Sequence, residues 1–189
     1  MPHRIALTNP DADTNLIILM GVSGSGKSSL AKALADYYGY SYLDGDDFHS
    51  QEARDRMASG HPLTDDMRLP WVIRMRDFLR DAARNQQHAT LAFSGLKRLH
   101  RNELRKAGLK TLFLFLDSDK LTIQSRVNQR ANHFMAPTLV DSQFESLELP
   151  HQEADIFKID VHAPFDQVLA QAIHVIDQEF DRQTDALPA

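Results

Sequence analysis

The segment Gly21-Val-Ser-Gly-Ser-Gly-Lys-Ser28 constrains this chain more than any other feature of its sequence. It follows a short apolar run, Leu16–Met20, which is typical of a strand buried on both faces. After it comes Lys27–Tyr38, whose apolar residues have helical spacing and which Gly39 can end. A strand, a glycine-rich turn and a helix in this order predict the start of an α/β fold.

The rest of the chain repeats this alternation. We predict further strands over 40–43, 90–94, 111–116 and 156–161, and helices over 65–85, 98–107, 120–131 and 165–180. In the helix over 65–85, the apolar stripe of Trp71, Met75, Phe78, Leu79 and Ala82 is assigned to the core. Strands that alternate with helices pair in parallel, and the helices cover both faces of the sheet. The expected fold class is therefore α/β, with three α/β/α layers around a central parallel five-stranded sheet.

Composition and charge narrow the possible partners. Twenty-one Lys and Arg against 26 Asp and Glu give a net charge of −5, so no net positive charge is present to hold a nucleic acid. The absence of cysteine excludes disulfides, thiolate metal sites and cysteine nucleophiles. No apolar run approaches the ~20 residues of a membrane span, and the N-terminus lacks the apolar core of a signal peptide. We therefore expect a single-domain cytoplasmic protein that binds neither nucleic acid nor a membrane.

The glycine-rich segment fits the pattern G-x-x-x-x-G-K-[ST] of a phosphate-binding loop. Glycines let the backbone turn so that its N–H groups surround a phosphate, and the following helix adds its positive end. Lys27 would reach the β- and γ-phosphates of ATP, and the Ser28 hydroxyl would bind Mg²⁺. A chance Gly/Ser-rich turn is the alternative. The residues expected to bind the nucleotide are Gly21, Ser23, Gly24, Ser25, Gly26, Lys27, Ser28 and Ser29.

A second candidate site follows the second predicted strand. Asp44 and Asp46 stand two positions apart in Leu43–His49, so in an extended segment they would share a face. One carboxylate could hold Mg²⁺ while the other accepts the proton of a hydroxyl, as a kinase requires. The alternative is an ordinary Asp/Gly turn whose carboxylates are solvated.

Two pairs of cations complete the candidates. Lys97 and Arg101 are four positions apart on a predicted helix and could clamp a carboxylate or a phosphate. Arg126 and Arg130 lie one turn apart, where a mobile lid could neutralise charge on transferring phosphates. For both pairs a solvated helix face is the alternative. His100 is assigned to the surface or to a cap.

With these motifs the chain resembles the gluconokinases, small P-loop sugar-acid kinases related in fold to the shikimate and adenylate kinases. The resemblance extends over about 16–161. The motifs that carry it are Gly21–Ser28, Leu43-Asp-Gly-Asp-Asp-Phe-His49, Met57-Ala-Ser-Gly-His-Pro-Leu-Thr-Asp65, Arg68-Leu-Pro-Trp71, Ser94-Gly-Leu-Lys97 with Arg101, His133-Phe134, and Ser142-Gln-Phe-Glu-Ser-Leu-Glu148. The first motif occurs in many families of NTPases, whereas the Pro-Trp and Ser-Gln-Phe runs are specific to far fewer families.

The resemblance implies an ATP- and Mg²⁺-dependent kinase that phosphorylates the terminal hydroxyl of D-gluconate, commonly as a cytosolic homodimer. It implies one P-loop kinase domain over 1–189, with substrate-binding helices over about 47–85 and a small helical lid over about 119–147. Asp46 would orient the acceptor hydroxyl, and Asp44 would lie near the metal. The implied catalytic residues are Lys27, Asp46 and Arg126, and Arg126 and Arg130 would contact the nucleotide. The implied acceptor-binding residues are Asp46, His49, Arg56, Arg68, Lys97, Arg101 and His133.

Several positions depart from the family pattern, and we expect them to lie where the acceptor binds. They are Ser50, Ala53, Arg56, Met67, His100, Asn102 and Asn132. Three functions therefore stay open at this point. The chain could be a gluconokinase, a kinase of another hydroxy acid such as shikimate or a different aldonate, or a non-catalytic ATP-binding regulator.

Overall fold

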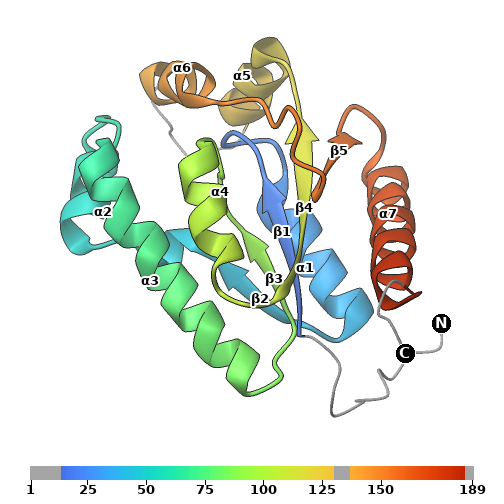
Figure 1. The fold of residues 1–189 in the computed structure, drawn as a ribbon. Coiled ribbons are helices and arrows are strands. Elements are labelled where there is room, and N and C mark those ends of the chain that lie inside the picture. Colours follow the sequence, from blue (N-terminus) through green and yellow to red (C-terminus); the bar gives the residue numbers. More distant parts are fainter. Residues whose placement is uncertain (1–13, 130–136, 186–189) are drawn as a thin grey trace.

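The computed structural model of this protein describes residues 14–129 and 137–185. Within these ranges, five parallel strands form one sheet with the order β2-β3-β1-β4-β5 (Figure 1). The strands are β1 (Asn15–Met20), β2 (Ser41–Asp44), β3 (Ala89–Ala92), β4 (Lys110–Asp117) and β5 (Ile156–Asp160). The parallel five-stranded sheet predicted from the sequence is confirmed.

Helices cover both faces of this sheet, which confirms the three layers. They are α1 (Lys27–Tyr38), the 3-10 helix η1 (Gly45–Phe48), α2 (Gln51–Ala58), α3 (Asp65–Arg84), α4 (Arg98–Arg105), α5 (Lys120–Gln129), α6 (Pro137–Ser146) and α7 (Phe165–Asp185). Figure 1 shows α1 and α7 on one face, α3 and α4 on the other, and α5 and α6 beyond the carboxyl ends of the strands.

The central strand β1 explains why the layers form. Its residues Leu16–Met20 are fully buried. Because successive side chains of a strand point to opposite faces, Leu16 and Ile18 pack with α3 and α4, whereas Ile17 and Leu19 pack with α1 and α7. A continuous apolar run is what a strand covered on both faces requires.

Some details differ from the sequence-based expectation. Phe78, assigned to the core stripe of α3, is 48% exposed and meets Phe48 edge-on. The periodicity of the sequence does not indicate α2, whose one buried residue is Ala53. The hydroxyl of Ser50 caps this helix by accepting a hydrogen bond from the Ala53 N–H (3.2 Å).

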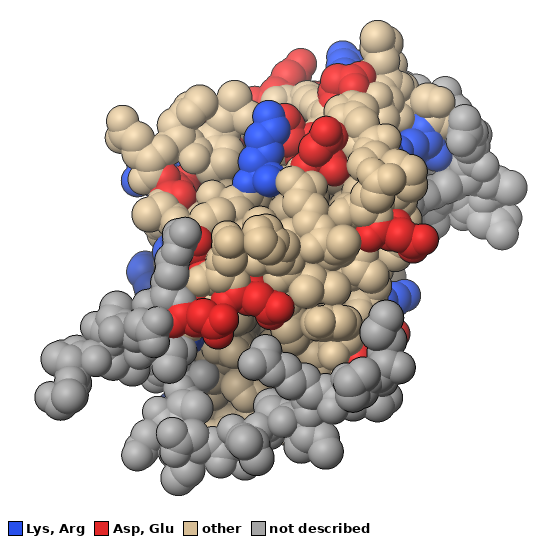
Figure 2. Space-filling view, turned by 90° about the vertical axis from the view of Figure 1, so that its right-hand side faces the viewer, with Lys and Arg blue, Asp and Glu red and all other residues tan. Residues whose placement is uncertain are grey.

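Charged side chains are spread over the surface. On the side of the molecule that α7 occupies, Figure 2 shows acidic groups with basic groups between them, as the net charge of −5 leads one to expect. Among the described helices, none is both long enough and apolar enough to cross a membrane.

Candidate active site

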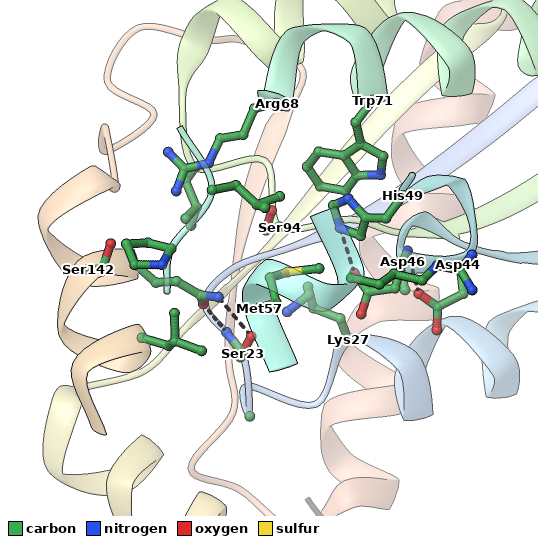
Figure 3. A pocket seen from close by; sticks show the side chains of 18 of the residues that line it. Ser23, Lys27, Asp44, Asp46, His49, Met57, Arg68, Trp71, Ser94 and Ser142 are labelled. Atoms are coloured by element: carbon green, nitrogen blue, oxygen red, sulfur yellow. Dashed lines mark hydrogen bonds and ion pairs between the residues drawn. The ribbon is translucent and has the colours of Figure 1, made fainter. Parts of the chain in front are cut away.

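A cavity of about 660 Å³ lies beyond the carboxyl ends of β1, β2 and β3. Its wall is formed by the loop between β1 and α1, the turn after β2, helices α2 and α3, the end of β3, and α6 (Figure 3). Ligands of parallel α/β sheets bind at this edge. The structure therefore brings the first and second candidate sites of the sequence to one place.

The loop 21–28 between β1 and α1 is held against the sheet. Gly21 donates its N–H to the Ser94 carbonyl (3.0 Å) after β3. A Cβ added at Gly21 would stand 2.8 Å from the Leu116 carbonyl of β4, and the residue has a φ of +142°. Only glycine fits this position without displacing the loop.

The helix α1 begins without a side-chain cap. Its N-cap residue, Gly26, has a φ of +101° and provides no side chain to accept hydrogen bonds from the first turn. The first N–H groups of a helix have no acceptor within the helix. An anion placed at this end would satisfy them, so the loop geometry fits the phosphates of a nucleotide.

Three polar side chains of the loop support this fit. The Lys27 Nζ donates to the Val22 carbonyl (2.9 Å), so the ammonium group lies over the loop. The Ser25 Oγ is buried and has no hydrogen-bond partner among the residues that the structure describes. Ser28 is exposed at the start of α1 and, like Asp44, lines the cavity. A hydroxyl and a carboxylate are oxygen ligands of the kind Mg²⁺ prefers, so the two residues fit this ion.

Asp44 and Asp46 both line the cavity, but their local geometry differs from the expectation. Asp46 lies in η1, so the extended segment predicted for the pair is wrong. Asp44 ends β2, and its Oδ1 accepts a hydrogen bond from the Asp46 N–H (3.0 Å). A side chain that caps a turn in this way bends the chain immediately after it. The Asp46 carboxylate is thereby carried to the cavity on the turn itself.

Tyr42 orients the other oxygen of Asp44. Its hydroxyl donates to Asp44 Oδ2 (2.9 Å). Burial raises the pKa of Tyr42 to about 12, and its neighbours Asp44 and Asp47 add to the rise. The phenol therefore stays protonated near neutral pH and keeps donating its hydrogen bond.

The turn that carries Asp46 is fixed from α3 and β3. The Trp71 indole N–H donates to the Gly45 carbonyl (2.7 Å), and a Cβ at Gly45 would stand 2.9 Å from the Ala92 carbonyl. His49 stacks on Trp71 with ring centroids 4.1 Å apart, and its Nε2 lies 3.5 Å from Asp46 Oδ1. The apolar pattern of α3 predicts Trp71 only as a core residue and gives no sign of this hydrogen bond. The narrow Pro-Trp motif was the signal that could have revealed it.

Of the basic residues predicted to bind the acceptor, some line the cavity and others do not. Arg68 lines the cavity, with its Nη1 3.4 Å from Asp65 Oδ1. Lys97 and Arg56 do not line it. The Lys97 Nζ contacts Asp65 Oδ2 (2.6 Å), and the Arg56 Nε donates to the Pro62 carbonyl (2.7 Å).

The structure contradicts the placement of Arg101 in the acceptor pocket. Its side chain is fully buried, pairs with Glu153 Oε1 (2.5 Å) and donates to the Gly95 carbonyl (2.7 Å). Lys97 is the N-cap of α4, and its carbonyl accepts from the Arg101 N–H one turn later (3.2 Å). The expected clamp fails because the two side chains diverge, Lys97 to Asp65 and Arg101 inward to Glu153. His100, assigned to the surface, is 3% exposed. Burial, followed by the charge of Arg68, lowers the pKa of His100.

The remaining predicted residues lie away from the cavity or outside the described ranges. The Arg126 Nη2 donates to the Val161 carbonyl (2.7 Å) at the end of β5. Arg130 and His133 lie outside the described residues.

The positions that depart from the family pattern also lie elsewhere. Ser50, Ala53, Arg56, Met67, His100 and Asn102 are absent from the cavity wall, and Asn132 falls outside the described ranges. Among them, Ser50, Ala53 and Met67 directly adjoin in sequence residues of the wall, namely His49, Arg54 and Arg68. That these departures surround the acceptor stays a prediction.

The fold and the loop together define a P-loop kinase. Residues 16–150 match the AAA domain family. The thermosensitive gluconokinase of Escherichia coli (strain K12) is 41% identical over 155 residues, which cover 82% of this chain and 83% of that relative. The thermoresistant gluconokinase of the same organism is 35% identical over 90% of this chain and 98% of the relative. The crystal structure of a gluconokinase from Sinorhizobium meliloti 1021 superposes with a TM-score of 0.82 at 32% identity, covering 92% of this chain and 98% of that chain. This chain belongs to the gluconokinase family.

Proposed function

We propose that this protein is an ATP-dependent kinase that transfers the γ-phosphoryl group to the terminal hydroxyl of D-gluconate and gives 6-phospho-D-gluconate. One observation carries the proposal: in a chain of the gluconokinase family, the phosphate loop and the Asp46 carboxylate line the same cavity. A donor and an acceptor bound there would be neighbours.

The donor side of the cavity belongs to the loop and α1. Backbone amides of the loop and the Lys27 ammonium would bind the phosphates of ATP. Ser28 and Asp44 would hold Mg²⁺, which when bound neutralises charge on the phosphates. Tyr42 would keep the Asp44 carboxylate oriented through its hydrogen bond (2.9 Å).

The acceptor side belongs to η1 and α3. The acceptor oxygen would bond to the γ-phosphorus while the bond from that phosphorus to the β–γ bridging oxygen breaks, and the hydroxyl proton would pass to Asp46. The Arg68 guanidinium would pair with the carboxylate of the sugar acid. His49 would support Asp46 from its place on Trp71.

One observation favours gluconate over an altered acceptor: the described departures from the family pattern lie off the cavity wall. Lys27, Ser28, Asp44 and Asp46 are all in place on the wall, which favours a kinase over a non-catalytic regulator. The lid over about 119–147, the nucleotide contacts of Arg126 and Arg130, the acceptor contact of His133, the homodimer and the cytoplasmic location stay predictions.

A coupled assay of ADP release over a panel of sugar acids tests the proposal. We expect turnover on gluconate to exceed turnover on every other acid of the panel. Asp46→Asn should lower kcat by about 10²-fold or more with little change in the KM for ATP, because it removes the proton acceptor.

Asp47→Asn is the matched control, because Asp47 lies in the same turn but does not line the cavity. It should keep nearly full activity. If the unaltered protein transfers phosphate to no sugar acid, the proposed function is wrong.

A further inference from the structure

One side chain of α6 makes two hydrogen bonds to one residue of the phosphate loop. The Oε1 of Gln143 accepts from the Ser23 N–H (2.6 Å), and its Nε2 donates to the Ser23 Oγ (3.0 Å). Figure 3 draws both bonds as dashed lines at Ser23. The two residues are 120 positions apart in the sequence, and both line the cavity of about 660 Å³.

A carboxamide is suited to this contact. The Ser23 N–H needs an acceptor, and the hydroxyl oxygen can accept from a donor. Glutamine has both groups on one planar head, whereas a carboxylate offers acceptors alone and an ammonium offers donors alone. The neighbouring N–H groups of Gly21 and Ser25 are bonded within the sheet and the loop, to the carbonyls of Ser94 (3.0 Å) and Val22 (3.3 Å). Gln143, which lies on α6, thus provides the hydrogen-bond acceptor for the Ser23 N–H that the loop itself does not provide.

The helix that carries Gln143 is anchored on the segment between β3 and α4 and on the first residue of α4. The backbone N–H of Glu148, just after α6, donates to the Leu96 carbonyl (2.8 Å), and its carboxylate accepts from the Arg98 N–H (2.7 Å). Val140 of α6 is buried with Val22 of the loop in one apolar cluster. Ser142 also lines the cavity, on the side that faces Arg68 in Figure 3.

We propose that Gln143 is a positioning residue that fixes the phosphate loop relative to the acceptor wall. Its contact with Ser23 sets the separation between the transferring phosphoryl group and the acceptor hydroxyl, and it keeps water out of the space between them. The inference rests on the proposed kinase function. A displacement of ~1 Å in such a site can cost about 10² in rate.

Gln143→Ala should therefore lower kcat about 10- to 100-fold while the KM values for ATP and gluconate stay within about threefold. The ratio of phosphate released to water over phosphate transferred to gluconate should rise. A merely structural role would lower the melting temperature and leave that ratio unchanged.

Gln143→Glu keeps the shape but cannot donate to the Ser23 Oγ, and it adds negative charge beside the phosphates. Its loss of kcat should be at least as large as that of Gln143→Ala. Glu145→Gln is the matched control, because Glu145 is exposed on the same helix, and it should behave as the unaltered protein does. Ser23→Ala removes one of the two hydrogen bonds and should lower kcat less than Gln143→Ala does. In the double variant the loss of kcat, expressed as a free energy, should be smaller than the sum of the two single losses.

A second measurement does not depend on any acceptor. Hydrogen exchange with a non-hydrolysable ATP analogue and Mg²⁺ should protect amides of the loop and of α6 in the unaltered protein. In Gln143→Ala the protection should be confined to the loop. Equal protection of α6 in both proteins, or an unchanged kcat and hydrolysis ratio in Gln143→Ala, overturns the inference. An unaltered protein that phosphorylates no sugar acid but shows the expected exchange difference overturns the proposed function and keeps the contact.

Discussion

Arg101 and Glu153 form an ion pair inside the protein. Arg101 is fully buried, and the Glu153 side chain is 4% exposed. Burial alone would raise the pKa of Glu153, but hydrogen bonds from Arg101 and Arg105 outweigh it and hold the pKa below its ordinary value. The stabilisation is therefore present above the ordinary pKa of a glutamate and is lost as the pH falls through the lowered one. The pair ties α4 to the segment before β5.

Replacing Arg101 by methionine should destabilise the protein strongly. It leaves the buried Glu153 with one of its two arginine partners, and breaking a buried pair typically costs about 3 kcal/mol or more. Urea unfolding measures this loss, and the KM for gluconate should hardly change, because Arg101 does not line the cavity. Arg98→Met, on the exposed side of α4, should cost less than about 0.5 kcal/mol. A raised KM with unchanged stability would instead support the acceptor-binding role predicted from the sequence.

Sequence reasoning found the polar residues of the cavity where one short motif places them, as for Lys27, Ser28, Asp44 and Asp46. It failed where a partner distant in sequence decides the direction of a side chain. Arg101 turns inward to Glu153, 52 positions away. Gln143 reaches Ser23 across 120 positions. No local pattern contains these pairings, although Gln143 lies in a motif that the resemblance singled out.

At the scale of elements, α5 is fastened to the end of β5 by a short chain of hydrogen bonds. His162 contacts Asp160 through Nδ1 (2.7 Å) and Asp119 through Nε2 (3.1 Å). Asp119 also caps α5 by accepting from the Thr122 N–H (2.9 Å). The hydrogen bonds that His162 donates to Asp119 and Asp160 raise the pKa of His162, and the hydrogen bonds that Asp119 accepts from Thr122, followed by that from His162, lower the pKa of Asp119.

This linkage predicts a pH-dependent stability. A histidine whose pKa is raised by folding stabilises fully below its ordinary pKa of about 6.5, and the contribution disappears as the pH rises through the raised value. The difference in melting temperature between the unaltered protein and His162→Gln should therefore be largest near pH 6 and should shrink toward about pH 9. His174→Gln, at an exposed position of α7, serves as the control and should show no such trend. A constant difference for His162→Gln across this range would contradict the prediction.

The elements themselves could be predicted to different degrees. The strand β1 and the helices α1 and α3 have strong apolar patterns, and the sequence places them within a residue or two. The helix α2 has almost no buried face, so periodicity gives no signal for it, and the resemblance alone anticipated helices over 47–85. The 3-10 turn η1 depends on the cap that Asp44 provides and on the bond from Trp71, which follows from packing.

At the scale of the whole molecule, the cavity joins segments from most of the chain. Its wall includes residues from Ser23 to Gln143, so it exists in the folded state and not in the unfolded chain. A ligand that binds the native state alone raises stability by mass action. The parallel sheet and its layers could be predicted from local sequence patterns. The composition of the cavity wall could not, because it depends on how distant segments pack in three dimensions.

ATP with Mg²⁺ should therefore protect the protein against heat. At a nucleotide concentration about 100-fold above Kd the gain is about 2.7 kcal/mol, which corresponds to roughly 5–10 °C in Tm for a chain of this size. Differential scanning fluorimetry measures the shift. Lys27→Ala should lose most of it, while Lys32→Ala, an exposed position of the same helix, should keep it. The same shift in both variants would remove Lys27 from the phosphate site.

The way Gly21 sits between two strands has a consequence for the encounter with nucleotide. The Gly21 N–H donates to the Ser94 carbonyl on one side, and on the other side a Cβ at Gly21 would stand 2.8 Å from the Leu116 carbonyl. These two neighbours fix the conformation of the turn before a nucleotide binds. An incoming nucleotide therefore meets a turn whose backbone is already fixed at Gly21, and less of the binding free energy is lost in ordering that turn.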